Sequence, residues 1–228
     1  MGVMIEGVWH AEEPASGSAD DGKYRRSVSA FRNWVTPDGA PGGEGCVGGF
    51  AAEAGRYHLY VALNCPWAHR TMIVRVLKGL EDVVSLDAVL PRRSAEGWIF
   101  AAPPEANSDS LLGSHALHKV YTAADTAFSG RVTVPVLWDK KRRTIVSNES
   151  SEIIRMLNSA FDDVGANGAD LYPTELRGDI DRVNERVYRS VNNGVYRAGF
   201  ARSQEAYEEA FDELFEALDM LEARLATR

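Results

Sequence analysis

The sequence predicts an α/β N-terminal domain followed by an all-α domain, and three patterns support this prediction. The first is a strand-length run of β-branched and aromatic residues at 57–63, an amphipathic helical pattern that closes near Gly79, and a second strand at 83–89. The second is a β-hairpin with a basic turn at 139–143, followed by a helix from about Ser150. The third is a C-terminal stretch in which apolar residues recur at helical spacing.

The order of these elements defines the α/β domain more closely. A strand, a helix and a strand in succession form a parallel βαβ unit with a right-handed crossover. A hairpin with strands at 132–138 and 144–146, followed by a helix, completes the layout of a thioredoxin-like domain. Between the two parts, residues from Pro91 to about Gly130 have an irregular pattern, so we expect a long insertion over one end of the sheet.

Two amphipathic helices are expected in the C-terminal part. On the first, valines repeat every four residues from Val183 to Val195, and the helix ends near Gly199. The second has the alternating four- and three-residue spacing of a bundle helix, carried by Tyr207, Phe211, Leu214, Leu218, Leu221 and Leu225. The sequence stops without a capping signal for this helix, so we expect the helical domain to be incomplete.

These patterns divide the chain into four parts. Residues 1–55 are rich in Gly, Ser, Asp and Pro, and we expect an extended N-terminal segment that wraps the next domain. Residues 56–157 form the thioredoxin-like domain, and 158–173 form a linker rich in Gly, Asn and Asp. Residues 174–228 form a partial all-helical domain.

Composition and charge exclude several classes of function. The 228 residues are 45% hydrophobic and 25% charged, as is usual for a soluble globular protein. The net charge of −8 and the scattered Lys and Arg residues offer no basic surface to nucleic acid. No apolar run approaches the roughly 18 residues of a membrane span, and the N-terminus does not resemble a signal peptide. We therefore expect a cytoplasmic protein without a nucleic-acid or membrane partner.

The two cysteines have different surroundings. Two are too few for a disulfide scaffold, so we expect free thiols. Cys46 lies in a glycine-rich stretch, 42–49, and is interpreted as an incidental loop residue. Cys65 lies at a strand-to-helix junction, where unpaired N–H groups and the positive end of the helix dipole stabilise a thiolate. A small core cysteine is the structural alternative, but the turn around Cys65 favours a reactive thiol.

The residue three positions after Cys65 indicates how such a thiol would be used. Ala68 stands where a C-x-x-C motif has its second cysteine. A single thiol cannot close a disulfide at that position, so it needs an external thiol to complete a reaction cycle. Glutathione is the obvious cytosolic candidate, acting as a co-substrate, and we expect no metal cofactor.

Two further motifs suit the recognition of a peptide such as glutathione. Thr133, Val134 and Pro135 precede a strand where this fold places a cis-proline, which exposes the preceding backbone to an extended ligand; a trans proline beside an edge strand is the alternative. Glu149 and Ser150 open a helix, where a carboxylate can bind an ammonium group and a hydroxyl with free N–H groups can bind a carboxylate. A plain helix cap explains Glu149 and Ser150 equally well.

Four segments of the sequence resemble the glutathionyl-hydroquinone reductases, which form the Xi class of glutathione transferases. They are Cys65-Pro66-Trp67-Ala68-His69-Arg70 and the stretches 130–139, 147–150 and 192–201. The resemblance runs from about Phe31 to the end of the sequence, and it implies the glutathione transferase architecture and a homodimer. The helical domain of that family continues beyond the last residue of this sequence.

The resemblance also implies a reaction and a set of site residues. Cys65 would attack the glutathionyl sulfur of a glutathionyl-hydroquinone, release the hydroquinone and hold a mixed disulfide that a second glutathione resolves. Trp98 would pack on glutathione, and Tyr196 would give or take the proton of the hydroquinone. From the residues alone, packing on an amphipathic helix explains Tyr196 better, and the resemblance reverses this preference. The backbone and γ-glutamyl end of glutathione would be held by Arg131, Val132, Thr133, Val134, Glu149 and Ser150.

Other functions remain open on the residues alone. An omega-like thiol transferase or dehydroascorbate reductase would use the same Cys65 thiol with a different acceptor, although Tyr196 and Trp98 favour an aromatic substrate. A non-catalytic glutathione-binding module would share the fold. A single thiol can also bridge an iron–sulfur cluster with glutathione, but the following helical domain disfavours that use.

Overall fold

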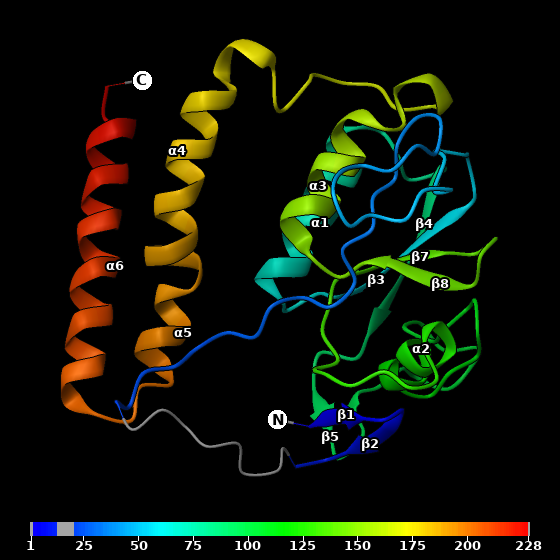
Figure 1. Cartoon of the computed structure of the whole chain (residues 1–228), viewed down its shortest axis with the longest axis horizontal. Helices are drawn as coiled ribbons and strands as arrows, with labels where there is room; N and C mark the ends of the chain where they lie inside the picture. Colours follow the sequence, from blue (N-terminus) through cyan, green and yellow to red (C-terminus); the bar gives the residue numbers. More distant parts are fainter. Residues whose placement is uncertain (1, 13–20, 228) are drawn as a thin grey trace. The chain divides into compact units, whose positions relative to one another are not determined.

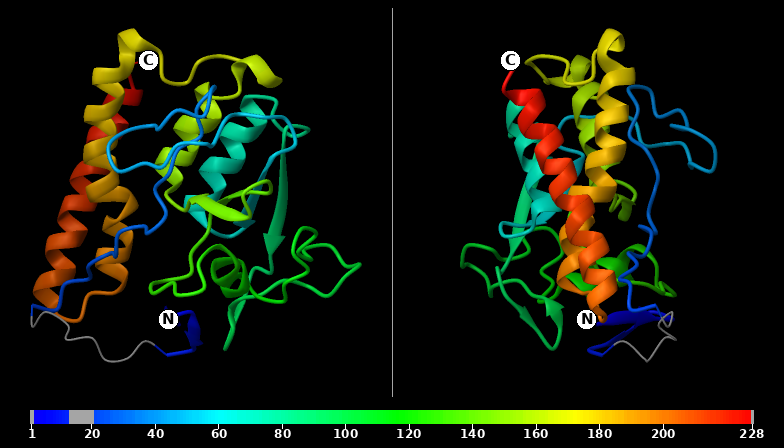
Figure 2. Two further views of the ribbon diagram at one scale, coloured as in Figure 1. Left: turned by 45° about the vertical axis from the view of Figure 1, so that its right-hand side comes forward. Right: turned by 90° about the vertical axis from the view of Figure 1, so that its left-hand side faces the viewer.

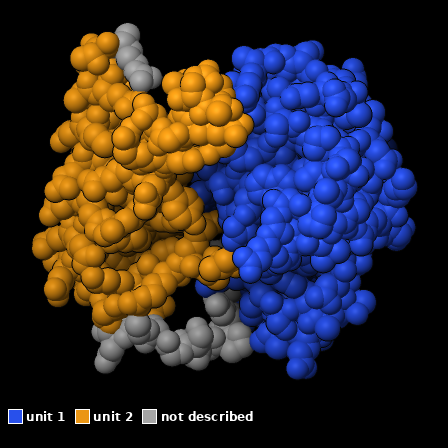
Figure 3. Space-filling model, turned by 45° about the horizontal axis from the view of Figure 1, so that its top comes forward, with its two compact units in different colours: residues 1–13, 29–171 blue, residues 14–28, 172–228 orange. Residues whose placement is uncertain are grey.

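The computed structural model describes residues 2–12 and 21–227 of the chain. These residues belong to two units, which Figure 3 shows in different colours: residues 1–13 with 29–171, and residues 14–28 with 172–228. The first unit contains the predicted α/β domain and the second contains the predicted helices. The four-part division of the chain stays a prediction, and residues 13–20 of its N-terminal segment lie outside the described residues.

A four-stranded sheet in the order β4-β3-β7-β8 forms the centre of the first unit (Figure 1). Strand β3 is parallel to β4 and antiparallel to β7, and β7 is antiparallel to β8. This arrangement confirms the predicted thioredoxin-like order. The strands are β3 (Tyr57–Ala62), β4 (Val84–Val89), β7 (Val136–Asp139) and β8 (Thr144–Ser147).

Both faces of this sheet are covered, because all six residues of the central strand β3 are buried. Side chains alternate between the two faces of a strand. Tyr57 therefore packs on Phe161 at the end of the helix after β8, while Tyr60 packs on Phe100 in the insertion. Helices α1 (Pro66–Leu77) and α3 (Ser150–Ser159) contact each other and lie side by side in both views (Figure 1, Figure 2).

The insertion after β4 is more regular than the sequence predicts. It contains a small hairpin, β5 (Arg93–Ser94) with β6 (Gly97–Trp98), and a helix, α2 (Leu117–Ala124). The helix contacts β6 and β8. The expectation of an irregular insertion was wrong. Helix α2 is only eight residues long, and a helical pattern this short, with loops on both sides, is difficult to distinguish from irregular sequence.

The N-terminal residues add to the first unit in two places. A hairpin of β1 (Val3–Ile5) and β2 (Val8–His10), which the sequence does not predict, pairs with the insertion through Met4 and Gly130. A second stretch runs beside β8: the Asn33 amide donates to the carbonyl oxygen of Val146 at 2.9 Å, and the Asn148 amide donates to that of Phe31 at 3.1 Å. This stretch pairs with the edge of the sheet.

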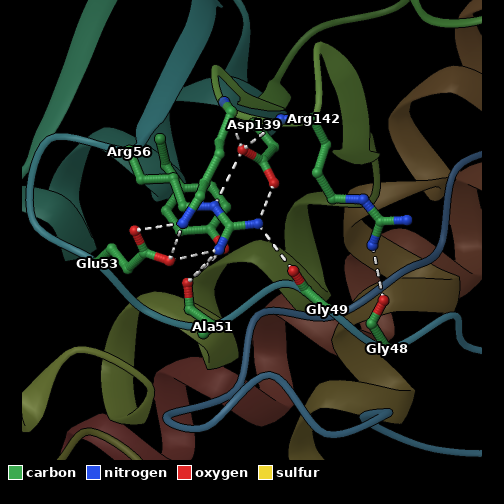
Figure 4. A network of polar contacts seen from close by, with 9 residues as sticks. Gly48, Gly49, Ala51, Glu53, Arg56, Asp139 and Arg142 are labelled. Carbon is green, nitrogen blue, oxygen red and sulfur yellow. Dashed lines mark hydrogen bonds and ion pairs between the residues drawn. The ribbon is translucent and has the colours of Figure 1, made fainter.

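A buried ion pair joins the N-terminal segment to the β7–β8 turn (Figure 4). Arg56 and Asp139 are 8% and 0% exposed, and two hydrogen bonds of 3.0 and 2.5 Å connect the guanidinium and carboxylate groups. The same guanidinium donates to the carbonyl oxygens of Gly49 and Ala51 at 2.8 and 3.3 Å. Asp139 also accepts the amides of the turn at 141 and 142. The pair therefore fixes two loops at once.

The second unit is helical but its first helix is interrupted. Helix α4 (Arg177–Val187) continues into a π-helical turn (Tyr188–Asn192) and then α5 (Gly194–Gly199). The Asn193 amide donates to the Tyr188 carbonyl oxygen at 2.9 Å, five residues back, where an α-helix would bond four back. The helical stretch ends at Gly199 as predicted, but it is not one continuous α-helix. Valines repeating every four residues drift by about 40° per step on a regular α-helix, so their spacing does not reveal the interruption.

Helix α6 (Gln204–Leu225) forms where the sequence predicts it and lies beside α4 and α5 (Figure 2). Ser203 caps it by accepting the Ala206 amide at 3.2 Å. The expected seam is not its buried face: Tyr207 and Phe211 are 41% and 39% exposed, and the buried residues of α6 are Ala206, Ala210 and Ala217. Small alanines allow the helices to approach closely. Among the described residues, no helix has the length and apolar character of a membrane span.

Candidate active site

Cys65 lies where β3 ends and α1 begins. It is the N-cap residue of α1, with extended backbone angles of φ −99° and ψ 116°, and Pro66 opens the helix. Its side chain makes no capping hydrogen bond, and its thiol is free and half-buried. The first turn of a helix has N–H groups without intrahelical partners, and the helix dipole favours negative charge there. This position is therefore suited to a thiolate.

The loop before β7 lies next to the thiol. Cys65 Sγ is 3.9 Å from the carbonyl oxygen of Val134. The peptide bond between Val134 and Pro135 is cis, which confirms the prediction made for this position. Val132 and Val134 are buried, and Arg131 is half-buried at the start of the loop. Val134 of the predicted loop and the predicted nucleophile are thus neighbours.

A buried tyrosine that the sequence analysis missed holds this loop. The Tyr121 hydroxyl donates to the Thr133 carbonyl oxygen at 2.9 Å and accepts the Thr133 amide at 3.2 Å. Asn148 Nδ2 donates to the same hydroxyl at 3.1 Å, and Asn148 Oδ1 accepts the Phe31 amide at 3.1 Å. Burial raises the pKa of Tyr121, so its phenol stays neutral and able to donate. Tyr121 and Asn148 therefore position the loop that faces Cys65.

Glu149 is the N-cap of α3, and its carboxylate accepts several hydrogen bonds. It accepts the Ser151 amide at 3.2 Å, the Ser151 hydroxyl at 2.8 Å and the Ser29 hydroxyl at 2.9 Å. Burial by itself raises the pKa of Glu149, but these hydrogen bonds and the nearby Arg70 guanidinium outweigh burial and lower it. Glu149 is therefore a fixed anion beside the candidate site.

Arg70 of α1 bonds to the start of α3, a contact that no pattern in the sequence predicts. Its Nε and Nη2 donate to the Ser150 hydroxyl oxygen at 3.0 and 2.7 Å, and Nη2 is 3.7 Å from a Glu149 oxygen. The guanidinium also lies 5.0 Å from the centroid of the Trp67 ring. Ser150 is 3% exposed, and its hydroxyl oxygen accepts from Arg70 in this structure. The pairing places a positive charge between α1 and α3.

Trp98 occupies the second strand of the insertion hairpin. The residue is 8% exposed, and the Arg93 guanidinium lies 4.4 Å from the centroid of its ring. In the part of the chain that the structure describes, the buried Trp98 Nε1 has no hydrogen-bond partner. Asn64 links this region to the nucleophile, because its Nδ2 donates to the Pro91 carbonyl oxygen at 2.7 Å, two residues before the hairpin.

Tyr196 belongs to α5 of the second unit. Its ring packs on Phe200 and Tyr24, with centroid distances of 6.2 and 6.4 Å. The guanidinium of Arg26 lies 5.6 Å from the Tyr196 centroid. The N-terminal stretch around 24–26 therefore contributes to the surroundings of Tyr196, which the sequence analysis did not foresee.

Comparison with known proteins assigns the family. Residues 64–160 match the glutathione S-transferase N-terminal domain. The chain is 56% identical over 223 residues to the glutathionyl-hydroquinone reductase YqjG of Escherichia coli, an alignment that spans 97% of this chain and 67% of the relative. The chain belongs to the glutathionyl-hydroquinone reductase family. A second member of this family, PcpF of Sphingobium chlorophenolicum, is 50% identical over 228 residues, which span 100% of this chain and 69% of the relative.

Solved structures agree with this family assignment. The glutathione-bound structure of YqjG superposes with a TM-score of 0.87 at 53% identity and spans 100% of this chain and 68% of its own. The chain thus spans about two thirds of the length of these relatives. Membership of the glutathionyl-hydroquinone reductases confirms the predicted glutathione transferase architecture. The roles of the individual site residues stay predictions.

Proposed function

We propose that this protein removes glutathione from glutathionyl-hydroquinones through a mixed disulfide between Cys65 and glutathione. The observation that carries the proposal is the free Cys65 thiol at the N-terminus of α1, 3.9 Å from the Val134 carbonyl oxygen. A free thiol at a helix N-terminus, beside a loop with a cis-proline, is suited to attack the sulfur of a bound glutathionyl group. Membership of the glutathionyl-hydroquinone reductase family supports the substrate class.

The reaction balances in two steps. In the first, the Cys65 thiolate attacks the glutathionyl sulfur, an S–S bond forms, and the bond between that sulfur and the aromatic carbon breaks. The electron pair stays with the carbon, which takes up a proton and gives the hydroquinone. In the second, a glutathione thiolate attacks the glutathionyl sulfur of the mixed disulfide and releases glutathione disulfide and the Cys65 thiolate. Overall the conjugate is reduced and glutathione is oxidised.

The surrounding residues suit the three parts of glutathione. The loop Arg131–Val134 would pair with its backbone, and Trp98 would pack against it. Glu149 would bind the ammonium group of the γ-glutamyl end, because its carboxylate is a fixed anion. Arg70 brings a cation to the same place, through Ser150, and would bind the adjacent carboxylate.

The mass of the Cys65 peptide tests the proposal directly. After incubation with a glutathionyl-hydroquinone and without free glutathione, we expect a glutathione adduct on Cys65 and release of one hydroquinone per adduct. Addition of glutathione should then remove the adduct and form glutathione disulfide. An unmodified Cys65 under these conditions contradicts the mechanism.

Replacing Glu149 with alanine is expected to weaken glutathione binding by about 2 kcal/mol, the scale of a charge-assisted hydrogen bond. Glu149→Gln separates this effect from helix capping, because the amide oxygen can still accept the Ser151 amide. Calorimetric titration with glutathione measures both, and Glu152→Ala is the matched control in the same helix turn. Unchanged dissociation constants in both Glu149 variants would leave that residue with a capping role alone.

Tyr196→Phe is expected to lower kcat on glutathionyl-hydroquinones by about 10²-fold, the usual scale of general acid–base catalysis. The reason is that the aromatic carbon needs a proton as the carbon–sulfur bond breaks. A small mixed disulfide of glutathione has a good leaving thiolate, so turnover of that substrate should stay near normal. The exposed Tyr207, replaced by Phe, is the control. An equal loss of kcat on both substrates would indicate that Tyr196 has a structural role. Unchanged kcat on both substrates would favour a broader thiol transferase.

We also propose that the protein works in the cytoplasm as a homodimer. A free-thiol mechanism driven by glutathione fits a reducing compartment. Sedimentation of the purified protein at several concentrations tests the oligomeric state.

A further inference from the structure

Three potential metal ligands meet where the insertion hairpin touches α2. They are Glu96, His115 and His118, and their nearest ligand atoms all lie within 4.8 Å of one another. Glu96 Oε2 is 2.9 Å from His118 Nε2 and 3.4 Å from His115 Nε2. Two imidazoles and one carboxylate are a common donor set for divalent transition metals.

The hairpin is held in place by Trp9. The Trp9 ring stacks on His118, with a centroid distance of 5.0 Å and an interplanar angle of 9°, and its Nε1 donates to the Ala95 carbonyl oxygen at 2.9 Å. Gly97 has φ +72°, and a Cβ at that position would lie 2.8 Å from the Trp9 ring. Trp9 therefore packs both on the turn that carries Glu96 and on the ring of His118.

The two histidines are fixed to the same region by the backbone. The Phe100 amide donates to the His115 carbonyl oxygen at 2.9 Å, and Ile99 forms a β-bridge with Ala116. His118 follows on the first turn of α2 and is 3% exposed. Figure 1 shows β1, β2 and β5 together at the end of the first unit that lies next to α2.

We propose that Glu96, His115 and His118 bind one Zn²⁺ ion. Tetrahedral Zn²⁺ with bonds of about 2.0–2.1 Å separates its ligand atoms by about 3.4 Å, close to the spacing between Glu96 and each histidine. His115 has a side chain that is 65% exposed, so its ring is free to adjust its distance to the buried His118 ring. A water molecule would complete the four ligands. This site departs from the sequence-based expectation of no metal.

Bound Zn²⁺ would tie the hairpin to α2. Glu96 lies two residues before Trp98, so the ion would restrain the strand that carries this aromatic ring. The plain alternative is that Glu96 accepts hydrogen bonds from the two histidines without a metal. The two explanations differ in one expectation: only a metal site loses affinity for Zn²⁺ when any one of the three side chains is replaced.

The test is a calorimetric titration of the full chain with zinc chloride. The double variant Cys46→Ser, Cys65→Ser is the background, because free thiols also bind Zn²⁺. We expect one equivalent to bind, and His115→Ala or Glu96→Gln should raise the dissociation constant by about tenfold or more. His115 is exposed, so its replacement leaves the packing of Trp9 on His118 in place. The matched control is His69→Ala. His69 is an exposed histidine on α1, so this variant should bind Zn²⁺ with the same dissociation constant as the background.

Two measurements identify the place of binding. Zn²⁺ should shift the ring resonances of His115 and His118 but not those of the other three histidines, and it should slow amide exchange across 93–98. Unchanged affinity in His115→Ala, shifts at other histidines, or no binding in the background without the two cysteines would each overturn the proposal.

Discussion

Cys65→Ser should abolish turnover of glutathionyl-hydroquinones while leaving glutathione binding nearly unchanged. A serine hydroxyl is a far poorer nucleophile near neutral pH than a thiolate at a helix N-terminus. We expect the rate to fall by at least about 10⁴-fold, the scale seen when an enzyme loses its nucleophile. The binding groups proposed here, the 131–134 loop and Glu149, are untouched by the change. Steady-state kinetics and calorimetric titration with glutathione measure the two effects.

Cys46→Ser is the matched control for this substitution. Cys46 is the second free thiol, and it lies in a loop where its Sγ is 3.3 Å from the Arg32 carbonyl oxygen. It has neither a helix N-terminus nor the 131–134 loop beside it, so its replacement should leave turnover unchanged. Substantial turnover in the Cys65 variant, or an equal loss in the Cys46 variant, would contradict the assignment of the nucleophile.

Asp139→Ala is expected to lower the free energy of unfolding by about 3–5 kcal/mol, because it removes the buried carboxylate that pairs with Arg56 and leaves this buried guanidinium with the more exposed Glu53 as its ionic partner. Two amides of the β7–β8 turn would also lose their acceptor. Urea unfolding followed by circular dichroism gives the change. The matched control is Asp82→Ala, an exposed aspartate of the same unit, which should change stability by no more than about 0.5 kcal/mol.

A double-mutant cycle tests whether the ion pair is the cause. Once Asp139 is replaced, further replacement of Arg56 removes a guanidinium that has already lost its buried partner, so the two losses should not add. Additive losses would show that Arg56 and Asp139 act independently, through the loops that each one contacts.

The sheet and its main helices could be predicted because each has a local signature. The run at 57–62 is β-branched and aromatic, and the helix after it starts at Pro66 and closes near Gly79. Cys65 could be found for the same reason, since its position between a strand and a helix is visible in the sequence. The cis-proline at 135 was predicted from its place before a strand of this fold.

The remaining parts of the site depend on contacts between distant residues, which leave no local pattern. Arg70 and Ser150 are 80 positions apart, and Ser29 and Glu149 are 120 apart. A second cause is burial: Tyr121 looks like one more apolar residue of a short helix, and only its hydroxyl contacts with Thr133 and Asn148 show its role. Glu96 likewise lies 19 and 22 positions before the two histidines, so only the short spacing between His115 and His118 is visible in the sequence.

The pairing of the N-terminal stretch with β8 determines how this protein can associate with itself. An uncovered edge strand presents free N–H and C=O groups, which can recruit a strand from another molecule and start aggregation. Here the backbone of residues 31–33 occupies those groups along β8. Growth of the sheet from one molecule to the next is therefore blocked at this edge, and copies that meet there have to do so through side chains.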